Sequence, residues 1–295
     1  MTEIFGISLQ ALLSQLLIGL VNGSFYAMLS LGLAVIFGLL NIINFTHGAL
    51  YMMGAFGAWM GFTYLGLSYW LCLLLVPLAV GAFGILIERT MLARLYKLDH
   101  LYGLLLTFGL ALIIQGVFTN FYGSSGLPYR IPDELGGSFN LGFMFLPKYR
   151  AWVIGASVVV CLGTWFVIER TKLGAYLRAG TENPALVQAF GINVPRMITL
   201  TYGFGVGLAA FAGVMAAPIY QVNPQMGANL IIVVFAVVVI GGMGSIFGAV
   251  LTGFGLGVVE GLTKVFFPVA SNTVIFVIMV IVLILRPAGL FGKER

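Results

Sequence analysis

Long apolar runs fill almost the whole chain, and short polar or glycine-rich segments separate them. A helix needs about 20 consecutive apolar residues to cross the hydrocarbon core of a membrane. Most of the runs are near that length, so the pattern predicts an all-α polytopic membrane protein. The runs cover residues 9–29, 31–45, 48–67, 69–87, 101–121, 151–168, 198–217, 229–247, 248–264 and 273–285.

Two stretches are too long to be one span each. A continuous helix over 9–45 would be about 55 Å long, whereas the hydrocarbon core is about 30 Å thick. We therefore expect this stretch, and likewise 229–264, to break or to fold back. The pattern then predicts a bundle of eight to ten transmembrane helices, some short or broken, in one transmembrane domain over 1–295. Polar or glycine-rich breakers lie at Asn22-Gly23-Ser24, from Asn41 to Gly48, and from Gly241 to Ser245.

The basic residues fix the expected orientation of the chain. Ten of the 14 basic residues fall in segment 88–100, in segment 169–197 and in the tail after residue 285. Two and then four predicted spans separate these segments, so all three can face the same side. The positive-inside rule makes that side cytoplasmic. The C-terminus and loop 169–197 are then cytoplasmic, and 122–150 becomes an outward loop with little regular structure.

The composition is typical of a membrane protein and argues against several other classes of protein. Hydrophobic residues make up 61% of the chain and charged residues 8%, against about 25% charged in soluble domains. The basic residues behind the net charge of +5 lie in short loops. They therefore indicate the orientation of the spans, and we predict no nucleic-acid partner. Cys72 and Cys161 lie in apolar runs and are expected to be buried, without a disulfide or a metal. The N-terminus lacks the basic start of a signal peptide, so we expect the chain to be retained whole.

The segment 38–54 places polar side chains between two apolar runs. Asn41, Asn44 and His47 follow i, i+3 spacing, which puts them on one face of a helix, and Thr46 lies beside them. In one interpretation they satisfy the backbone of a broken helix or bond a neighbouring span. In the other they line a pathway or a gate, because irregular backbone in a membrane is tolerated only in protein or beside a cavity. No nucleophile or carboxylate lies nearby, so we predict no catalytic residue and no metal site.

Glu260 is an acidic residue deep in a C-terminal apolar run, and acids inside membranes are functional candidates. Lys264 follows four residues later, in the order that favours an ion pair on a helix. An ion pair and a pathway role are both open for Glu260. Asn22 is a further pathway candidate. Weaker candidates are Ser24, Gln115, Asn120 and Asn229.

Gly253, Gly257 and Gly261 repeat at four-residue spacing and form a smooth stripe on one helix face. Small residues let helix backbones approach closely in lipid. We therefore assign these glycines to helix packing, with the lining of a pathway as the alternative.

A short helix is predicted inside loop 169–197. Asn183 suits the N-cap, Pro184 suits the first helical position, and Gly191 suits the left-handed position after the helix. These signals predict about two helical turns on the cytoplasmic side. Such a helix, unusually apolar for its size, docks on a partner or packs back on its own protein. Its apolar residues are Leu186, Val187, Ala189 and Phe190.

Six sequence blocks together resemble the branched-chain amino acid ABC permease family, the shorter of its two permease subunits. They run in order along nearly the whole chain, and the family usually has Ala where this chain has Thr46. Glu182, Ala185 and Gly191 also fit the loose signature of the coupling helix of ABC importers. The blocks are Asn44-Phe45-Thr46-His47-Gly48, Ile87-Glu88-Arg89, Gly191-Ile192-Asn193, Gly241-Gly242-Met243-Gly244-Ser245-Ile246, Gly248-Ala249 and Arg286-Pro287-Ala288-Gly289-Leu290-Phe291-Gly292.

The resemblance implies a permease domain of an ATP-driven importer in a bacterial-type inner membrane. Its expected partners are cytoplasmic ATPase subunits, a second permease that is a homologue or another copy, and an extracytoplasmic substrate-binding protein. The chain has no G-x-x-x-x-G-K-[ST] phosphate loop, so we expect no enzyme activity and no cofactor of its own. The residues expected to couple to the ATPase are Glu182, Asn183, Pro184, Ala185, Leu186, Val187, Phe190 and Gly191.

Alternatives stay open for the transported solute and for the functional class of the protein. Branched-chain amino acids are implied by the resemblance, and urea, amides and aromatic acids stay open as cargo. The runner-up function is a stand-alone secondary transporter or channel, which would need coupling groups along its path. An intramembrane enzyme would need paired carboxylates, a Ser/His pair or a metal cluster in the spans.

Overall fold

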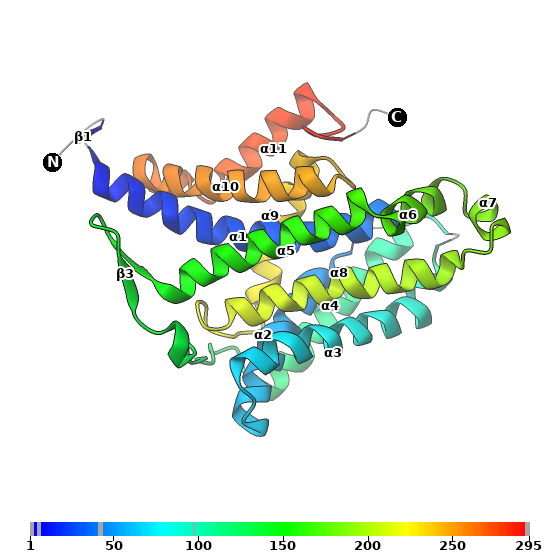
Figure 1. The fold of residues 1–295 in the computed structure, drawn as a ribbon, viewed down its shortest axis with the longest axis horizontal. Coiled ribbons are helices and arrows are strands. Elements are labelled where there is room, and N and C mark those ends of the chain that lie inside the picture. The colour runs from blue at the N-terminus through cyan, green and yellow to red at the C-terminus, as the bar shows by residue number, and fades with distance from the viewer. Residues whose placement is uncertain (1–2, 5–6, 41–43, 97, 293–295) are drawn as a thin grey trace. The chain divides into compact units, whose positions relative to one another are not determined.

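The structure, a computed structural model, describes residues 3–4, 7–40, 44–96 and 98–292. It is 77% helical (Figure 1). The helices are α1 (Leu9–Leu40), α2 (Thr46–Leu65), α3 (Tyr69–Thr90), α4 (His100–Tyr122), α5 (Lys148–Arg170), α6 (Lys172–Glu182), α7 (Pro184–Ala189), α8 (Val194–Ala216), α9 (Met226–Gly241), α10 (Ile246–Phe266) and α11 (Val274–Leu285).

Within the described residues, six helices are long and apolar enough to cross a membrane. They are α1, α3, α4, α5, α8 and α10, and α9 and α11 are shorter apolar helices. The predicted all-α membrane fold is therefore confirmed. The count of eight to ten spans stays a prediction, as does the single domain over 1–295.

The predicted break at Asn22-Gly23-Ser24 is wrong, because α1 runs through it without interruption. The Ser24 hydroxyl donates to the Leu20 carbonyl of its own helix at 2.9 Å. Gly23 faces α10, where a Cβ at Gly23 would lie 3.1 Å from the Phe254 Cα. Gly23 thus serves contact between helices rather than a turn, and Ser24 bonds within its own helix.

The other two predicted breaks have different outcomes. Asn41 and the start of the second break lie outside the described residues, and α2 begins at Thr46. The third break is confirmed, because α9 ends at Gly241 and α10 begins at Ile246. Gly242 and Gly244 lie between them with φ of 101° and 85°, a region of backbone space that glycine enters without steric cost.

The predicted outward loop 122–150 contains little regular structure, as expected. Between α4 and α5 it holds a 3₁₀ turn, η2 (Asp133–Leu135), and a small antiparallel hairpin of β3 (Ser138–Asn140) and β4 (Phe145–Pro147). Further short elements are β1 (Glu3–Ile4) paired with β2 (Ile7–Ser8), η1 (Leu92–Arg94) and η3 (Pro268–Ala270).

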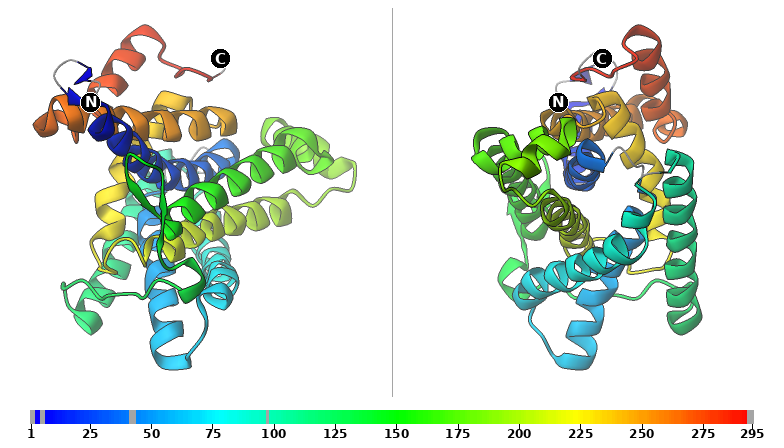
Figure 2. Two further views of the ribbon diagram at one scale, coloured as in Figure 1. Left: turned by 60° about the vertical axis from the view of Figure 1, so that its left-hand side comes forward. Right: turned by 90° about the vertical axis from the view of Figure 1, so that its right-hand side faces the viewer.

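The chain divides into two compact units, and each is described separately. The first comprises Met1–Ser30, Arg130–Cys161 and Val233–Arg295, and the second comprises Leu31–Tyr129 and Leu162–Ile232. In the first unit α1 and α10 run side by side, as Figures 1 and 2 show. Glycines bring the two backbones into contact, since a Cβ at Gly19 would lie 2.4 Å from the Gly257 carbonyl oxygen.

The C-terminal segment of the first unit crosses the break between α9 and α10. The Leu290 N–H donates to the Ile240 carbonyl at 2.8 Å, and the Phe291 N–H donates to the Gly241 carbonyl at 3.2 Å. These two carbonyls end α9 and have no partner within the helix. The ring of Phe291 also packs edge-on against Phe247 at 5.5 Å. Two of the sequence blocks therefore meet in space and close the helix break.

The core of the second unit is formed by α2, α3 and α8. Small residues bring α8 against both other helices. A Cβ at Gly54 of α2 would lie 2.3 Å from the Ala210 carbonyl oxygen, and one at Gly81 of α3 would lie 3.0 Å from the Gly203 carbonyl oxygen. Close backbone approach is the usual way in which helices pack in lipid, so the three helices form a tightly packed group.

Candidate functional site

The short helix predicted in loop 169–197 is present as α7. The Asn183 side chain accepts a hydrogen bond from the Leu186 N–H at 3.0 Å, as expected of an N-cap. Gly191 has φ of 83° and its N–H donates to the Gln188 carbonyl at 2.9 Å. Glu182 is the last residue of α6, so α7 itself begins at Pro184. The local sequence therefore defines both ends of α7.

The apolar residues of α7 point in two directions. Val187 is buried, with 6% of its surface exposed, whereas Leu186 is 54% and Phe190 77% exposed. Helix α6 packs against α7 and on the start of α8, where Gly180 lies against Val194 and Met197. Figure 1 shows α7 at the far end of α6, beside the start of α8. The helix is thus anchored by one side and presents two large apolar side chains on the other.

The polar segment around Asn44 is buried and hydrogen-bonded inside the second unit. The Asn44 amide nitrogen donates to the Tyr202 hydroxyl at 3.0 Å. The Thr46 hydroxyl donates to the Thr107 carbonyl at 2.8 Å, and the Phe45 N–H donates to the Thr107 hydroxyl at 3.2 Å. These bonds tie the start of α2 to α8 and α4.

The burial of this segment supports the structural interpretation of its polar residues. Asn44 is 1% exposed, and neither Thr46 nor His47 has any exposed surface. Gly32 of α1 lies against the His47 ring, because a Cβ there would be 3.0 Å from the His47 Cε1. The structure therefore brings Asn44, Thr46 and His47 together in the packed core. Their role as a pathway or gate stays a prediction.

Sequence reasoning missed Tyr202 and Thr107, the partners of this segment. Both lie inside apolar helices and far along the chain, 158 residues from Asn44 and 61 residues from Thr46. Spacing alone cannot connect them with residues 44–46. The one available signal was that each is a polar residue within a predicted span.

A small cavity of about 220 Å³ lies beside the polar segment in the second unit. Phe45, Gly48 and Ala49 of the α2 region line it, together with residues of α4 and the start of α9. Gln115 carries the only polar side chain among the lining residues. Asn120 and Asn229 are exposed and do not line this cavity. Of the weaker pathway candidates, Gln115 therefore lines this cavity.

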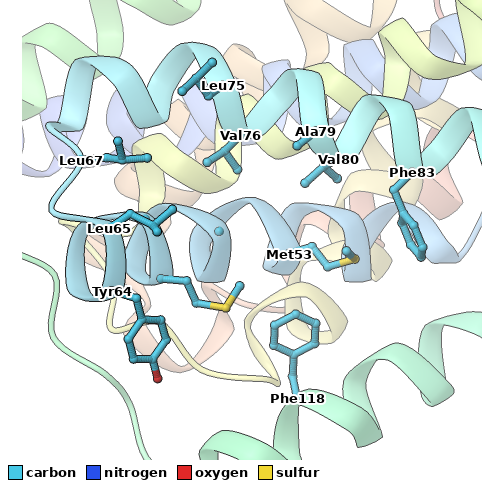
Figure 3. A pocket seen from close by; sticks show the side chains of 13 residues that line it. Met53, Tyr64, Leu65, Leu67, Leu75, Val76, Ala79, Val80, Phe83 and Phe118 are labelled. Carbon is cyan, nitrogen blue, oxygen red and sulfur yellow. The ribbon is translucent and has the colours of Figure 1, made fainter.

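A larger apolar pocket of about 640 Å³ lies between α2 and α3, as Figure 3 shows. Met53 and Tyr64 of α2, Val76 and Val80 of α3, and Phe118 of α4 contribute to its lining. Apart from the Tyr64 hydroxyl, the lining side chains have no polar group that could hold an ammonium or a carboxylate. The pocket fits an apolar surface rather than a whole amino acid.

Glu260 is buried in the first unit and is held by three donors. Lys264 contacts one carboxylate oxygen at 2.5 Å, and the Tyr26 hydroxyl donates to the other at 2.7 Å. The Asn22 amide also donates, at 3.4 Å. The structure thus brings the predicted residues Asn22 and Glu260 together, adds Tyr26, and contains the ion pair with Lys264. This supports the ion-pair interpretation of Glu260.

Glu88 is a second buried acid, and sequence reasoning placed it at the start of a loop. In the structure α3 continues to Thr90, and Glu88 is 2% exposed. The Tyr96 hydroxyl donates to one carboxylate oxygen at 2.6 Å, and the Thr199 hydroxyl donates to the other at 2.7 Å. Burial, and then the hydrogen bond to Glu88, raise the pKa of the Tyr96 phenol. The acidic residue beside Arg89 was visible in the sequence, but its long-range partner Thr199 was not.

The glycine stripe of α10 lies against the backbone of α1. A Cβ at Gly257 would lie 2.4 Å from the Gly23 backbone nitrogen, one at Gly253 would lie 2.5 Å from the Ala27 Cα, and one at Gly261 would lie 2.4 Å from the Gln15 carbonyl oxygen. Larger residues would separate the helices. The geometry supports the packing role assigned to this stripe.

Comparison with known proteins points to one family. The family model described as "Branched-chain amino acid transport system / permease component" matches residues 15–285. The permease protein BraD of the high-affinity branched-chain amino acid transport system of Pseudomonas aeruginosa is 32% identical over 298 residues, and the alignment covers 96% of both chains.

Two Escherichia coli proteins of a system with the same description are also similar to this chain. The permease protein LivH is 28% identical over 300 residues, covering 96% of both chains. The permease protein LivM is 28% identical over 296 residues, covering 92% of this chain and 68% of LivM. With its apolar helices, the chain therefore belongs to the family of branched-chain amino acid transport system permease components and is a multi-pass membrane protein.

Proposed function

We propose that this chain is the membrane permease subunit of an ATP-driven ABC importer. It forms the translocation path for branched-chain amino acids or related small solutes that an extracytoplasmic binding protein delivers. The family match over residues 15–285 supports this proposal, as do the names of the similar proteins, which are permeases of branched-chain amino acid transport systems.

The geometry of α7 supports the proposal that ATP drives transport through a partner bound at this helix. The helix lies in the loop that the positive-inside rule assigns to the cytoplasm, and it presents Leu186 and Phe190 to solvent. Two large exposed apolar side chains on a firmly capped helix suit the pocket of a partner better than contact with water. We assign that partner to the cytoplasmic ATPase subunits, because the chain has no phosphate loop of its own.

ATP would then act on this chain through α7. Closure of the ATPase subunits displaces α7 and shifts the spans between outward-open and inward-open arrangements, which is a two-state change biased by a bound partner. The chain lies in the inner membrane, with loop 169–197 and the C-terminus in the cytoplasm. Arg286, at the end of α11, agrees with this side for the tail.

A second permease completes the path. LivH and LivM are two different permease proteins of one organism, and both are similar to this chain. This favours pairing with a homologous subunit over pairing with a second copy. The oligomer purified from the native membrane distinguishes the two, because the first contains two permease sequences and the second contains one.

A stand-alone, ion-coupled transporter is the alternative class. Such a protein needs ionisable groups that can load and release an ion along the path. The two buried acids described above are each engaged by fixed donors. Glu260 contacts Lys264 of its own helix and Tyr26 of α1, and Glu88 accepts from Thr199 of α8 and from Tyr96 after η1. This arrangement favours fixed contacts, and so the importer.

The test is an affinity purification of the tagged chain from its native membrane in mild detergent, followed by mass spectrometry. Co-purification of an ATPase with a phosphate loop and of a second permease supports the proposal. A substrate-binding protein in the same sample would then be screened for its ligand. A chain that comes alone after mild crosslinking, and that accumulates solute in vesicles with an ion gradient but without ATP, contradicts it.

A further inference from the structure

The buried carboxylate of Glu88 joins three separate segments of the second unit. It belongs to the last turn of α3 and accepts hydrogen bonds from Tyr96, just after η1, and from Thr199 in the second turn of α8. Hydroxyl bonds to a carboxylate are charge-assisted and roughly twice as strong as neutral ones. Glu88 therefore holds the connection after α3 and the start of α8 to the same end of α3.

This position is unusual for a charged group. Glu88 is nearly inaccessible to solvent, and within the described residues no ion pair involves it. A buried carboxylate is costly to desolvate unless donors compensate it. If either hydroxyl moved away, the carboxylate would keep one of these two hydrogen-bond donors. Separation of α8 from α3 would therefore be costly, because it would leave the buried carboxylate with one donor fewer.

A continuous series of contacts leads from α7 to Glu88. Helix α7 packs on α6 and on α8, and Gly180 of α6 lies against Val194 and Met197 in the first turn of α8. Thr199 follows one half-turn later and bonds Glu88. Displacement of α7 therefore acts on the first turn of α8, next to the turn that Glu88 holds.

Beyond Glu88, glycines let α3 and α8 pack tightly against each other. A Cβ at Gly84 would lie 2.8 Å from the methyl carbons of Val206, and one at Gly203 would lie 2.6 Å from the Ile85 side chain. Interfaces packed this closely move as one body or switch between discrete arrangements, because they cannot deform gradually.

We propose that Glu88 is a positioning residue that makes the start of α8 and the end of α3 move together, so that displacement of α7 is passed to the spans. This inference rests on the proposed function, in which a partner acts on α7. It assigns to Glu88 the transmission of that displacement, and not contact with the transported solute.

The test compares ATP hydrolysis with solute uptake in the same vesicles, using the complex of this chain with its ATPase, second permease and binding protein. Thr199→Val and Tyr96→Phe each remove one hydroxyl with little change of shape, and Glu88→Gln removes the charge. Thr201→Val is the matched control, because among the described residues the Thr201 hydroxyl bonds only within α8, to the Met197 carbonyl at 2.9 Å.

We expect the first three variants to hydrolyse ATP but to take up roughly 2- to 30-fold less solute per ATP. Thr201→Val should keep the wild-type ratio. The double variant Glu88→Gln with Thr199→Val should lose less than the product of the two single losses, because both changes weaken the same contact. If Glu88→Gln fails to assemble, the two hydroxyl variants decide. An unchanged ratio in both of them overturns the inference.

A second readout separates this inference from the proposed function. If the wild-type complex shows no ATP-dependent uptake, the proposed function is contradicted, and amide hydrogen exchange of the isolated chain then tests Glu88. Thr199→Val should speed exchange both in 92–96 and in α6 and α7, whereas Thr201→Val should not. Faster exchange confined to the substituted turn of α8 overturns the inference.

Discussion

Helix α7 and the polar segment Asn44–His47 both depart from the rule that apolar side chains are buried and polar side chains are exposed. They do so in opposite ways. Helix α7, which has six residues, exposes Leu186 and its C-cap residue Phe190. The polar segment buries Asn44, Thr46 and His47 between apolar helices. Exposed apolar area costs about 25 cal/mol per Å² relative to burial, and a buried polar group without a partner costs about 1–3 kcal/mol.

The two regions differ in where the compensation comes from. The polar segment finds donors and acceptors inside its own unit, on Tyr202 and Thr107. The exposed side chains of α7 have no apolar cover from the described residues that pack on this helix. Helix α7 contacts α6 and α8, and its residue Val187 is buried. A polar residue in a membrane helix is therefore a poor guide to function here, and an apolar residue in a loop is a better one.

The largest effect should come from Gly191→Pro. Proline fixes φ near −65° and has no N–H, whereas Gly191 has φ of 83° and donates to the Gln188 carbonyl. The substitution should disorder the end of α7 and reduce ATP-dependent uptake to background, with a normal amount of protein in the membrane. Gly142→Pro is the control, because Gly142 has φ of 81° in the β3–β4 turn, away from α7 in sequence. Normal uptake by Gly191→Pro would remove α7 from the mechanism.

Leu186→Ser and Phe190→Ser should weaken binding of the ATPase subunits by roughly tenfold or more each, as for anchor residues of an interface. The stability of the chain should change little, because both side chains are exposed. Val187→Ala should show the opposite behaviour. Because Val187 is buried, this substitution should lower the free energy of unfolding by about 1–2 kcal/mol. Affinity by surface plasmon resonance and thermal unfolding in detergent measure the two effects. Equal affinities for all three variants would contradict the division of α7 into two faces.

Asn44→Ala should lower the free energy of unfolding by about 1–3 kcal/mol, because it leaves the buried Tyr202 hydroxyl without this partner. Adding Tyr202→Phe should cost less than the sum of the two single changes. Uptake per folded molecule should stay near wild type, and the same is expected of His47→Ala. Uptake that is lost while thermal unfolding is unchanged would instead assign these residues to the pathway.

The smallest effect should come from Thr46→Val. The change keeps the shape of the side chain and removes one hydrogen bond, to the Thr107 carbonyl. A single bond of this kind contributes about 0.5–1.5 kcal/mol. The thermal midpoint should fall slightly and transport should not change. A large loss of uptake in this variant would show that the start of α2 does more than hold the core together.

The features that could be predicted from the sequence are those with local causes. Asn183, Pro184 and Gly191 define α7 through contacts within a few residues of each other, so both ends of the helix follow from the sequence. The break between α9 and α10 follows in the same way from its glycines. The ion pair of Glu260 with Lys264 is a contact between residues four apart on one helix.

The features that could not be predicted depend on contacts between distant segments. Asn22-Gly23-Ser24 looked like a break, but Gly23 packs against Phe254 and α1 continues. Tyr202 meets Asn44, and Thr199 meets Glu88, only because α8 packs against α2 and α3. The closure of the α9–α10 break by Leu290 and Phe291 has the same origin. One sequence does not specify which helix faces meet.

The most direct test is site-specific photo-crosslinking from α7 in living cells. A photoreactive residue in place of Phe190 should crosslink a protein that carries a phosphate loop, and one in place of Leu200, an exposed residue on the transmembrane part of α8, should not. Crosslinks from position 190 to that ATPase would support a permease driven through α7. Crosslinks from position 190 only to lipid or to this chain itself, in cells that still take up solute, would contradict the account.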